Sequence, residues 1–167
     1  MQQQAWGYLN KQLAEEVRWM KEAEKKGTKN LEPSEMALQC LYADVLTSCT
    51  FIPKDVRSYF IGQLEKMTGR LTIYGKALLA IVLQEAGKEA KAKEFLESML
   101  QYSVMTGEMG RYFDSPKAEY SWFSYRIPTQ VAAIEAVKRI ANEEKTLEEM
   151  KQWLLKQKQA QAWETSV

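Results

Sequence analysis

Apolar residues recur at helical spacing through most of the chain. Near its start, Trp6, Leu9, Leu13, Val17 and Met20 lie three or four residues apart. This spacing puts apolar side chains on one side of an α-helix, and the same test predicts seven helices in all. Their expected bounds are residues 5–26, 34–46 with Ser34 as the cap, 54–68, 72–86, 89–105, 129–142 and from 146 onward.

The predicted helices alternate in how much of their surface is apolar. The first, third, fifth and seventh carry an apolar stripe on one side, whereas the second, fourth and sixth are apolar on almost all sides. Successive antiparallel helices are therefore expected to alternate between an outer solvated layer and an inner covered layer. The two-helix unit recurs after roughly 38 residues, which predicts an all-α fold, either a curved solenoid or a closed α/α toroid.

The regular pattern breaks between residues 106 and 127. Gly107, Gly110 and Pro116 are turn residues, and aromatic residues lie around them. This combination predicts a short hairpin or an ordered loop. The aromatics are expected either to contact a neighbouring domain or captured protein, since such residues dominate interfaces, or to fold back and plug the toroid. The candidate contact residues are Tyr112, Phe113, Tyr120, Trp122, Phe123 and Tyr125.

The last predicted helix opens on a capping pattern. Thr146 followed three residues later by Glu149 fits a capping box. The neighbouring Glu143, Glu144 and Glu148 are expected to favour the positive end of this helix and to aid solubility, rather than to form a site.

Composition indicates one ordinary soluble domain. The 167 residues are 46% hydrophobic and 27% charged, and the formal net charge is +1. No segment concentrates Lys and Arg without nearby Glu, so no basic patch for nucleic acid or an anionic membrane is expected. No run of 18 apolar residues and no signal-peptide pattern occurs, so direct membrane insertion is not expected.

The chain lacks the side chains that most enzymes use. It has no His, and its only Asp residues are Asp44, Asp55 and Asp114. The commonest general base and metal ligand are therefore missing. An α/α toroid enzyme such as a prenyltransferase or terpene cyclase would need a zinc site or clustered Asp residues, so neither enzymatic activity, nor a metal, nor a cofactor is expected.

The two cysteines are expected to be packed thiols. Cys40 and Cys49 are nine residues apart, which on one helix puts them on opposite faces and roughly 13 Å apart along the axis. A disulfide needs its two Cα atoms within about 7 Å, so these two are not expected to pair.

A series of short stretches, in order along the chain, resembles the helical thioester-type domain of bacterial alpha-2-macroglobulins. The family comprises large envelope proteins that entrap peptidases, and the version found in gut Bacteroidetes-type bacteria is the most similar. The stretches are Asn30-Leu-Glu-Pro-Ser34, Leu71-Thr-Ile-Tyr-Gly-Lys-Ala77, Gly107-Glu-Met-Gly-Arg-Tyr-Phe113, Tyr120-Ser-Trp122, Ile127-Pro-Thr-Gln130 with Ile134-Glu-Ala136, Trp153-Leu-Leu155 and Trp163-Glu-Thr165.

The resemblance implies that residues 1–167 are the later part of an α/α toroid within a larger multidomain protein of the periplasm or cell envelope. Its implied role is noncatalytic, in peptidase entrapment and inhibition, with neighbouring domains of the parent chain and captured peptidases as partners. An open, crescent-like array is expected, because a toroid needs more than seven helices. A stand-alone tetratricopeptide-like interaction scaffold is the alternative function.

The family's internal thioester joins a Cys to a Gln three positions later. Here Ala43 follows Cys40 at that spacing and Ile52 follows Cys49, so no thioester can form within this chain. Either the motif lies upstream in the parent protein, or the parent belongs to a type without it.

Overall fold

The computed structural model describes residues 2–48, 51–67, 71–113 and 126–165. This part of the chain is mostly helical, with seven helices and one antiparallel hairpin. The elements are α1 (Gln2–Lys25), α2 (Glu35–Thr47), α3 (Lys54–Glu65), α4 (Ile73–Glu85), α5 (Glu89–Leu100), β1 (Ser103–Thr106), β2 (Gly110–Phe113), α6 (Arg126–Ile140) and α7 (Glu144–Thr165). The prediction of a helical fold with a short hairpin is confirmed.

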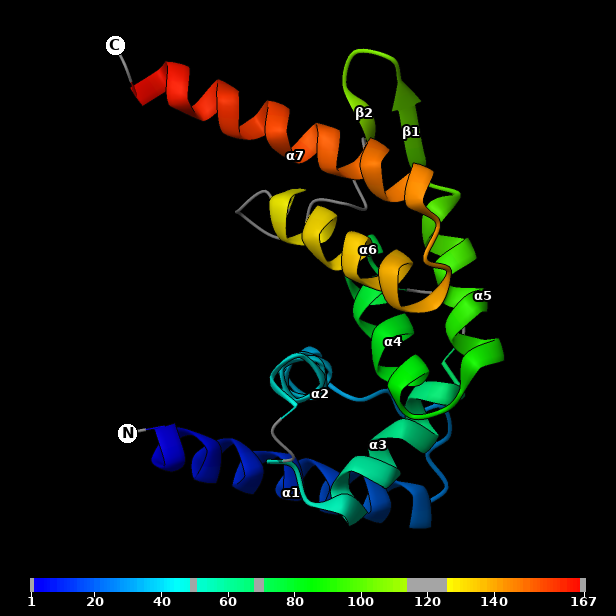
Figure 1. The fold of residues 1–167 in the computed structure, drawn as a ribbon. Helices are drawn as coiled ribbons and strands as arrows, with labels where there is room; N and C mark the ends of the chain where they lie inside the picture. Colours follow the sequence, from blue (N-terminus) through cyan, green and yellow to red (C-terminus); the bar gives the residue numbers. More distant parts are fainter. Residues whose placement is uncertain (1, 49–50, 68–70, 114–125, 166–167) are drawn as a thin grey trace.

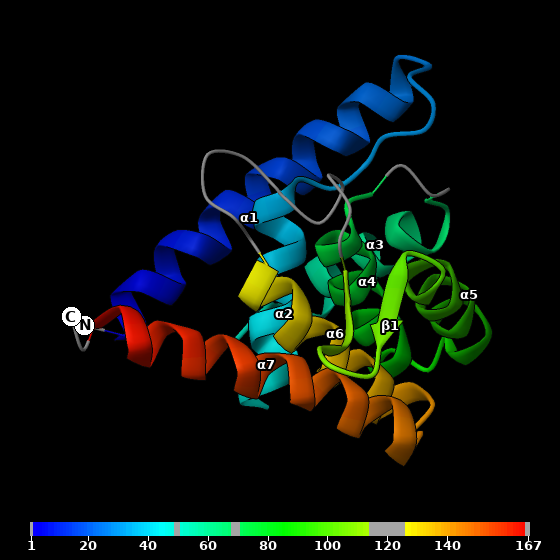
Figure 2. The same cartoon turned by 90° about the horizontal axis from the view of Figure 1, so that it is seen from above.

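The helices form a stack with α1 at one end and α7 at the other (Figure 1). Helix α4 lies in the middle, where it packs against α2, α5 and α6. Seen from above, α1 and α7 diverge from the side on which both chain ends lie, and α5 lies on the opposite side (Figure 2). The described helices make an array whose end helices stand apart, and they do not themselves form a ring.

Helix α4 is the buried centre that its sequence predicts. Thr72 caps it by accepting a hydrogen bond from the Gly75 backbone N–H at 3.0 Å. Every residue from Ile73 to Leu83 except Tyr74 is buried. A helix that is apolar all round is stable in water only when other elements cover it, and α2, α5 and α6 provide that cover.

Helices α2 and α6 are less buried than predicted. On α2, Met36 is 38% exposed and Leu46 is 46% exposed. On α6, Ile127 is 40% exposed and Val131 is 47% exposed. The prediction that these two helices are covered on almost all sides is therefore wrong, because the described elements that pack against α2 and α6 leave these four apolar side chains partly exposed.

The hairpin begins earlier than predicted. The helical pattern was expected to reach residue 105, but α5 ends at Leu100 and β1 starts at Ser103. The Ser103 hydroxyl donates to the Leu100 carbonyl at 2.7 Å, which satisfies one of the acceptors left free at the helix end. The two strands pair from Ser103 opposite Phe113 to Thr106 opposite Gly110.

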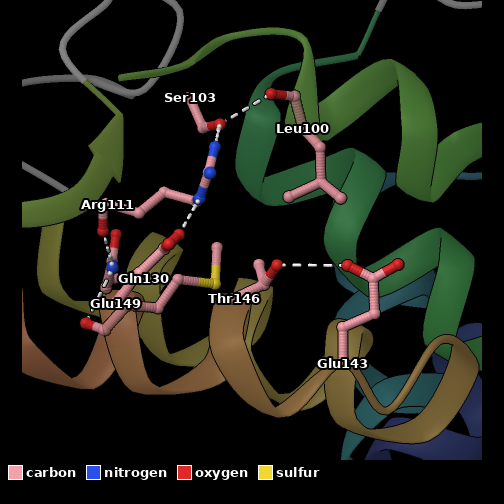
Figure 3. Close-up of polar contacts among 8 residues, drawn as sticks. Leu100, Ser103, Arg111, Gln130, Glu143, Thr146 and Glu149 are labelled. Carbon is pink, nitrogen blue, oxygen red and sulfur yellow. Dashed lines mark hydrogen bonds and ion pairs between the residues drawn. The ribbon is translucent and has the colours of Figure 1, made fainter. Parts of the chain in front are cut away.

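The start of α7 also differs from the prediction. The helix begins at Glu144, and the Leu147 N–H donates to the Glu143 carbonyl at 3.0 Å. The Thr146 hydroxyl donates to the Glu143 carboxylate at 3.1 Å (Figure 3). The predicted capping box at Thr146 is therefore wrong, because Thr146 lies within the first turn of α7 and its hydroxyl bonds back to Glu143.

Buried polar residues tie α2 to its neighbours. Asp44 is 5% exposed, forms an ion pair with Arg57 of α3 and accepts a hydrogen bond from the Phe51 N–H at 2.9 Å.

Cys40 is buried, as predicted. Its burial is the main cause that raises the pKa of its thiol, and the nearby Glu16 carboxylate raises it further. Cys49 lies outside the described residues.

Candidate protein-contact sites

The six aromatic residues proposed as a contact surface divide into two groups. Phe113 is 5% exposed and belongs to the core. The ring of Tyr112 stacks on that of Trp153 in α7, with ring centroids 6.2 Å apart and planes 12° apart. The other four, Tyr120, Trp122, Phe123 and Tyr125, lie outside the described residues. Contact of this segment with another protein stays a prediction.

Strand β2 lies directly on the backbone of α7. Gly110 has a φ of +81°, and a Cβ atom at this position would overlap the carbonyl oxygen of Glu149 and lie 3.0 Å from the Cβ of Gln152. Only glycine meets both conditions, because it tolerates a left-handed backbone and has no side chain to collide with the helix.

Arg111 links the hairpin to α7 by polar contacts. Its Nε donates to the Glu149 carboxylate at 2.9 Å, and its Nη1 donates to the Ser103 hydroxyl at 2.9 Å (Figure 3). The Arg111 side chain is 27% exposed and that of Glu149 is 12% exposed. A pair this well shielded is screened less by solvent than a surface pair.

Gln130 of α6 also contacts both the hairpin and α7. It is 1% exposed, and its Nε2 donates to the Arg111 carbonyl at 2.8 Å and to the Met150 carbonyl at 3.1 Å (Figure 3). One side chain thus joins α6, β2 and α7. We call the contacts of Gly110, Arg111, Gln130 and Glu149 the hairpin junction.

The hairpin junction positions an exposed apolar pair. Val104 and Met105 of β1 are 40% and 45% exposed. The sequence pattern missed both as surface residues, because it assigned them to the end of a helix. Successive strand residues point to opposite faces, so Val104 and Met105 expose apolar surface on the two sides of the hairpin, and each is a candidate contact residue.

A second candidate site is a cavity beside the N-terminal ends of α2 and α4. Its volume is 180 Å³, and it is lined mainly by apolar side chains from α2, α3, α4 and the residues next to them. A larger open cavity of 660 Å³ adjoins it and shares Glu32 and Met67 with it. We call the two together the α2 groove. Sequence periodicity gave no sign of it, since its walls come from separate segments.

The N-terminus of α2 is already satisfied from within the chain. The Glu16 carboxylate of α1 accepts from the Ser34 N–H and from the Ser34 hydroxyl, both at 2.7 Å. The Ser34 oxygen in turn accepts from the Ala37 N–H at 3.1 Å. Two further carboxylates, those of Glu32 and Glu35, line the smaller cavity beside this capped helix end.

Lys76 is a buried cation whose contacts are internal. It is 4% exposed, its Nζ donates to the Ser98 hydroxyl at 2.9 Å, and it lies 4.9 Å from the centroid of the Tyr102 ring. These contacts tie α4 to α5 and to the residue before the hairpin. Within the described residues, no three His, Cys, Asp or Glu side chains gather in a group that could hold a metal ion.

None of the helices in the described part of the chain is long and apolar enough to cross a membrane. Comparison with known protein families, curated proteins and solved structures found no match to this chain.

Proposed function

We propose that this chain is a noncatalytic helical domain of an alpha-2-macroglobulin-like protein of the periplasm or cell envelope, with a role in peptidase entrapment. Its helices would be part of an α/α toroid, and its partners would be neighbouring domains of the parent chain and captured peptidases. The absence of His from the sequence and the small number of Asp residues favour a binding role over hydrolysis.

The observation that carries this proposal is the hairpin junction. Three of the stretches that resemble the family are far apart in sequence, namely 107–113, 127–130 and the stretch that starts at Trp153. In the structure, Gly110 and Tyr112 lie on α7 at Trp153, and Gln130 bonds to the Arg111 carbonyl. These stretches lie on successive elements, and we take their meeting at one junction as support for a shared local fold.

The aromatic segment has a supporting role in this proposal. Tyr112 and Phe113 hold the hairpin to the helices, while Val104 and Met105 face outward. We propose that the outward pair, with the rest of the aromatic segment, contacts a neighbouring domain of the parent protein. Apolar residues on a fixed support lose little conformational entropy on binding.

The gene that encodes this chain provides the first test. If β-sandwich domains flank the segment in the full reading frame, the envelope-protein proposal is supported. If the reading frame consists of this helical array alone, the alternative of a stand-alone tetratricopeptide-like scaffold replaces it.

A further inference from the structure

The smaller cavity of the α2 groove has the size and lining of a site for one apolar side chain. Its volume is 180 Å³, and its apolar wall includes Leu38, Leu64, Met67, Leu71 and Leu78, with Pro33 and Tyr74 beside them. An apolar cavity of about 150 Å³ can hold benzene. A single phenylalanine ring or a leucine side chain therefore matches the space.

The wall of this cavity is preformed. Leu38 is 5% exposed, Leu64 is 1% exposed and Leu78 is fully buried. They come from α2, α3 and α4, so three packed helices fix their positions. A guest side chain would rest on this ordered floor and cover mainly the partly buried Leu71 and Tyr74 side chains, so the site does not have to be ordered first, which favours binding.

The adjoining cavity suits an extended backbone rather than a second apolar group. It has a volume of 660 Å³ and is open, and its lining includes Thr28, Asn30 and Gln63. These side chains offer hydrogen-bond donors and acceptors to a peptide main chain. Its charged residues are Glu24, Lys29, Lys66 and the shared Glu32, so beyond the smaller cavity it adds one net positive charge.

Charge therefore distinguishes the smaller cavity. Glu32 and Glu35 line it, both are exposed, and no Lys or Arg is part of its described lining. Ser34, which is held by Glu16, already caps α2 next to it, so the helix end does not need these two carboxylates as cap acceptors. A guest with a positive charge beside its apolar side chain would complement this rim.

We propose that the α2 groove binds an extended segment of a partner protein, with a Phe or Leu side chain in the 180 Å³ cavity and an adjacent Lys or Arg beside Glu32 and Glu35. The groove alone carries this inference, which does not depend on the parent being an envelope protein.

The test uses short peptides and the full 167-residue chain. The probes are acetylated, amidated tetrapeptides with the sequences Gly-Phe-Arg-Gly, Gly-Phe-Glu-Gly and Gly-Ala-Arg-Gly. Methyl NMR spectra are recorded during titration, and the resonances of Leu38, Leu64 and Leu78 report on the cavity wall. We expect Gly-Phe-Arg-Gly to shift these methyls and to bind at least fivefold more tightly than either of the other two peptides.

Two variants separate the charge from the cavity. Glu32→Gln with Glu35→Gln keeps the side-chain shapes on the surface, and it should remove the preference for Arg over Glu next to the Phe. Leu71→Trp should fill the cavity and abolish the methyl shifts, whereas Leu155→Trp on the exposed side of α7 should leave binding unchanged.

Two results would overturn the proposal. The first is the absence of methyl shifts at millimolar Gly-Phe-Arg-Gly, and the second is equal affinity for the Phe-Arg and Phe-Glu peptides in the unaltered chain. The double glutamine variant remains informative even if Leu71→Trp fails to fold, because both of its substitutions are at exposed residues.

Discussion

Gly110 of β2 lies so close to Glu149 of α7 that a Cβ atom at position 110 would overlap the Glu149 carbonyl oxygen. This contact brings the hairpin onto the helix backbone, and it places the Arg111 side chain beside the Glu149 carboxylate. Two segments nearly forty residues apart in sequence are therefore joined at a point where no side chain fits.

Gly110→Ala should destabilise the protein by about 2–5 kcal/mol. A left-handed backbone costs an alanine about 1–2 kcal/mol, and overpacking against α7 typically adds about 1–3 kcal/mol. Urea unfolding measured by circular dichroism gives the difference. Gly107→Ala is the matched control, because nothing lies within 4 Å of a Cβ there. Equal losses for the two variants would show that β2 does not contact α7 as described.

Replacing the buried amide of Gln130 should also weaken the hairpin junction. Gln130→Met keeps the length of the side chain but leaves the Arg111 and Met150 carbonyls without this donor. The Met150 carbonyl keeps its backbone partner within α7, so we expect the loss of the two side-chain hydrogen bonds to cost about 1–3 kcal/mol in all. Unfolding free energies and amide hydrogen exchange in β2 measure the effect. Exposed Gln159→Met on α7 should change neither quantity, and an unaffected Gln130→Met variant would contradict the described network.

A charge in the centre of α4 should be far more costly than a charge on the outside of α5. Leu79 is fully buried, so Leu79→Asp places a carboxylate where no partner is available, and we expect a loss of more than about 4 kcal/mol or failure to fold. Lys93 is exposed, and Lys93→Asp should cost well under about 1 kcal/mol. Chemical denaturation compares them, and similar tolerance at both positions would mean that α4 is not the core helix.

The thiol of Cys40 should ionise only at unusually high pH. Burial and then the Glu16 carboxylate raise its pKa, so the native state holds this proton more tightly than the unfolded chain does. The resulting stabilisation is fully present below the unfolded-state pKa of about 8.5 and is lost as pH rises through the native value.

The rate of alkylation by iodoacetamide as a function of pH measures this ionisation in a Cys49→Ser background. The midpoint should lie above that of glutathione measured in parallel, and Glu16→Gln should lower it, because a neighbouring negative charge is removed. A midpoint at or below that of glutathione would contradict the buried position of Cys40.

The sequence pattern predicted best where one residue type continued for several turns. The apolar run from Ala77 to Leu83 has no alternative to burial, and α4 is the central helix. The predicted start at residue 72 is one residue from the observed start at Ile73, which Thr72 caps.

The hairpin could not be delimited from local pattern. Val104 and Met105 continue the apolar spacing of α5, so the helical reading extended through them. Their strand conformation depends on pairing with Tyr112 and Arg111, and β2 in turn depends on the close approach of Gly110 to α7. Such contacts are long-range in sequence and leave no periodic signal.

The α2 groove was not predictable for a related reason. Its cavity needs Leu38, Leu64 and Leu78 side by side, and each of these has the ordinary pattern of a core residue in its own helix. The partial exposure of α2 and α6 likewise depends on which neighbours are present rather than on their own composition.

Peptidase entrapment by the full-length gene product tests the proposed function most directly. The purified protein is incubated with a peptidase, and hydrolysis of a large protein substrate is compared with hydrolysis of a small chromogenic peptide. The account predicts that hydrolysis of the large substrate falls severalfold while hydrolysis of the small peptide persists, because an entrapped peptidase remains active but shielded. Unchanged hydrolysis of the large substrate, or equal loss of both activities, would contradict it.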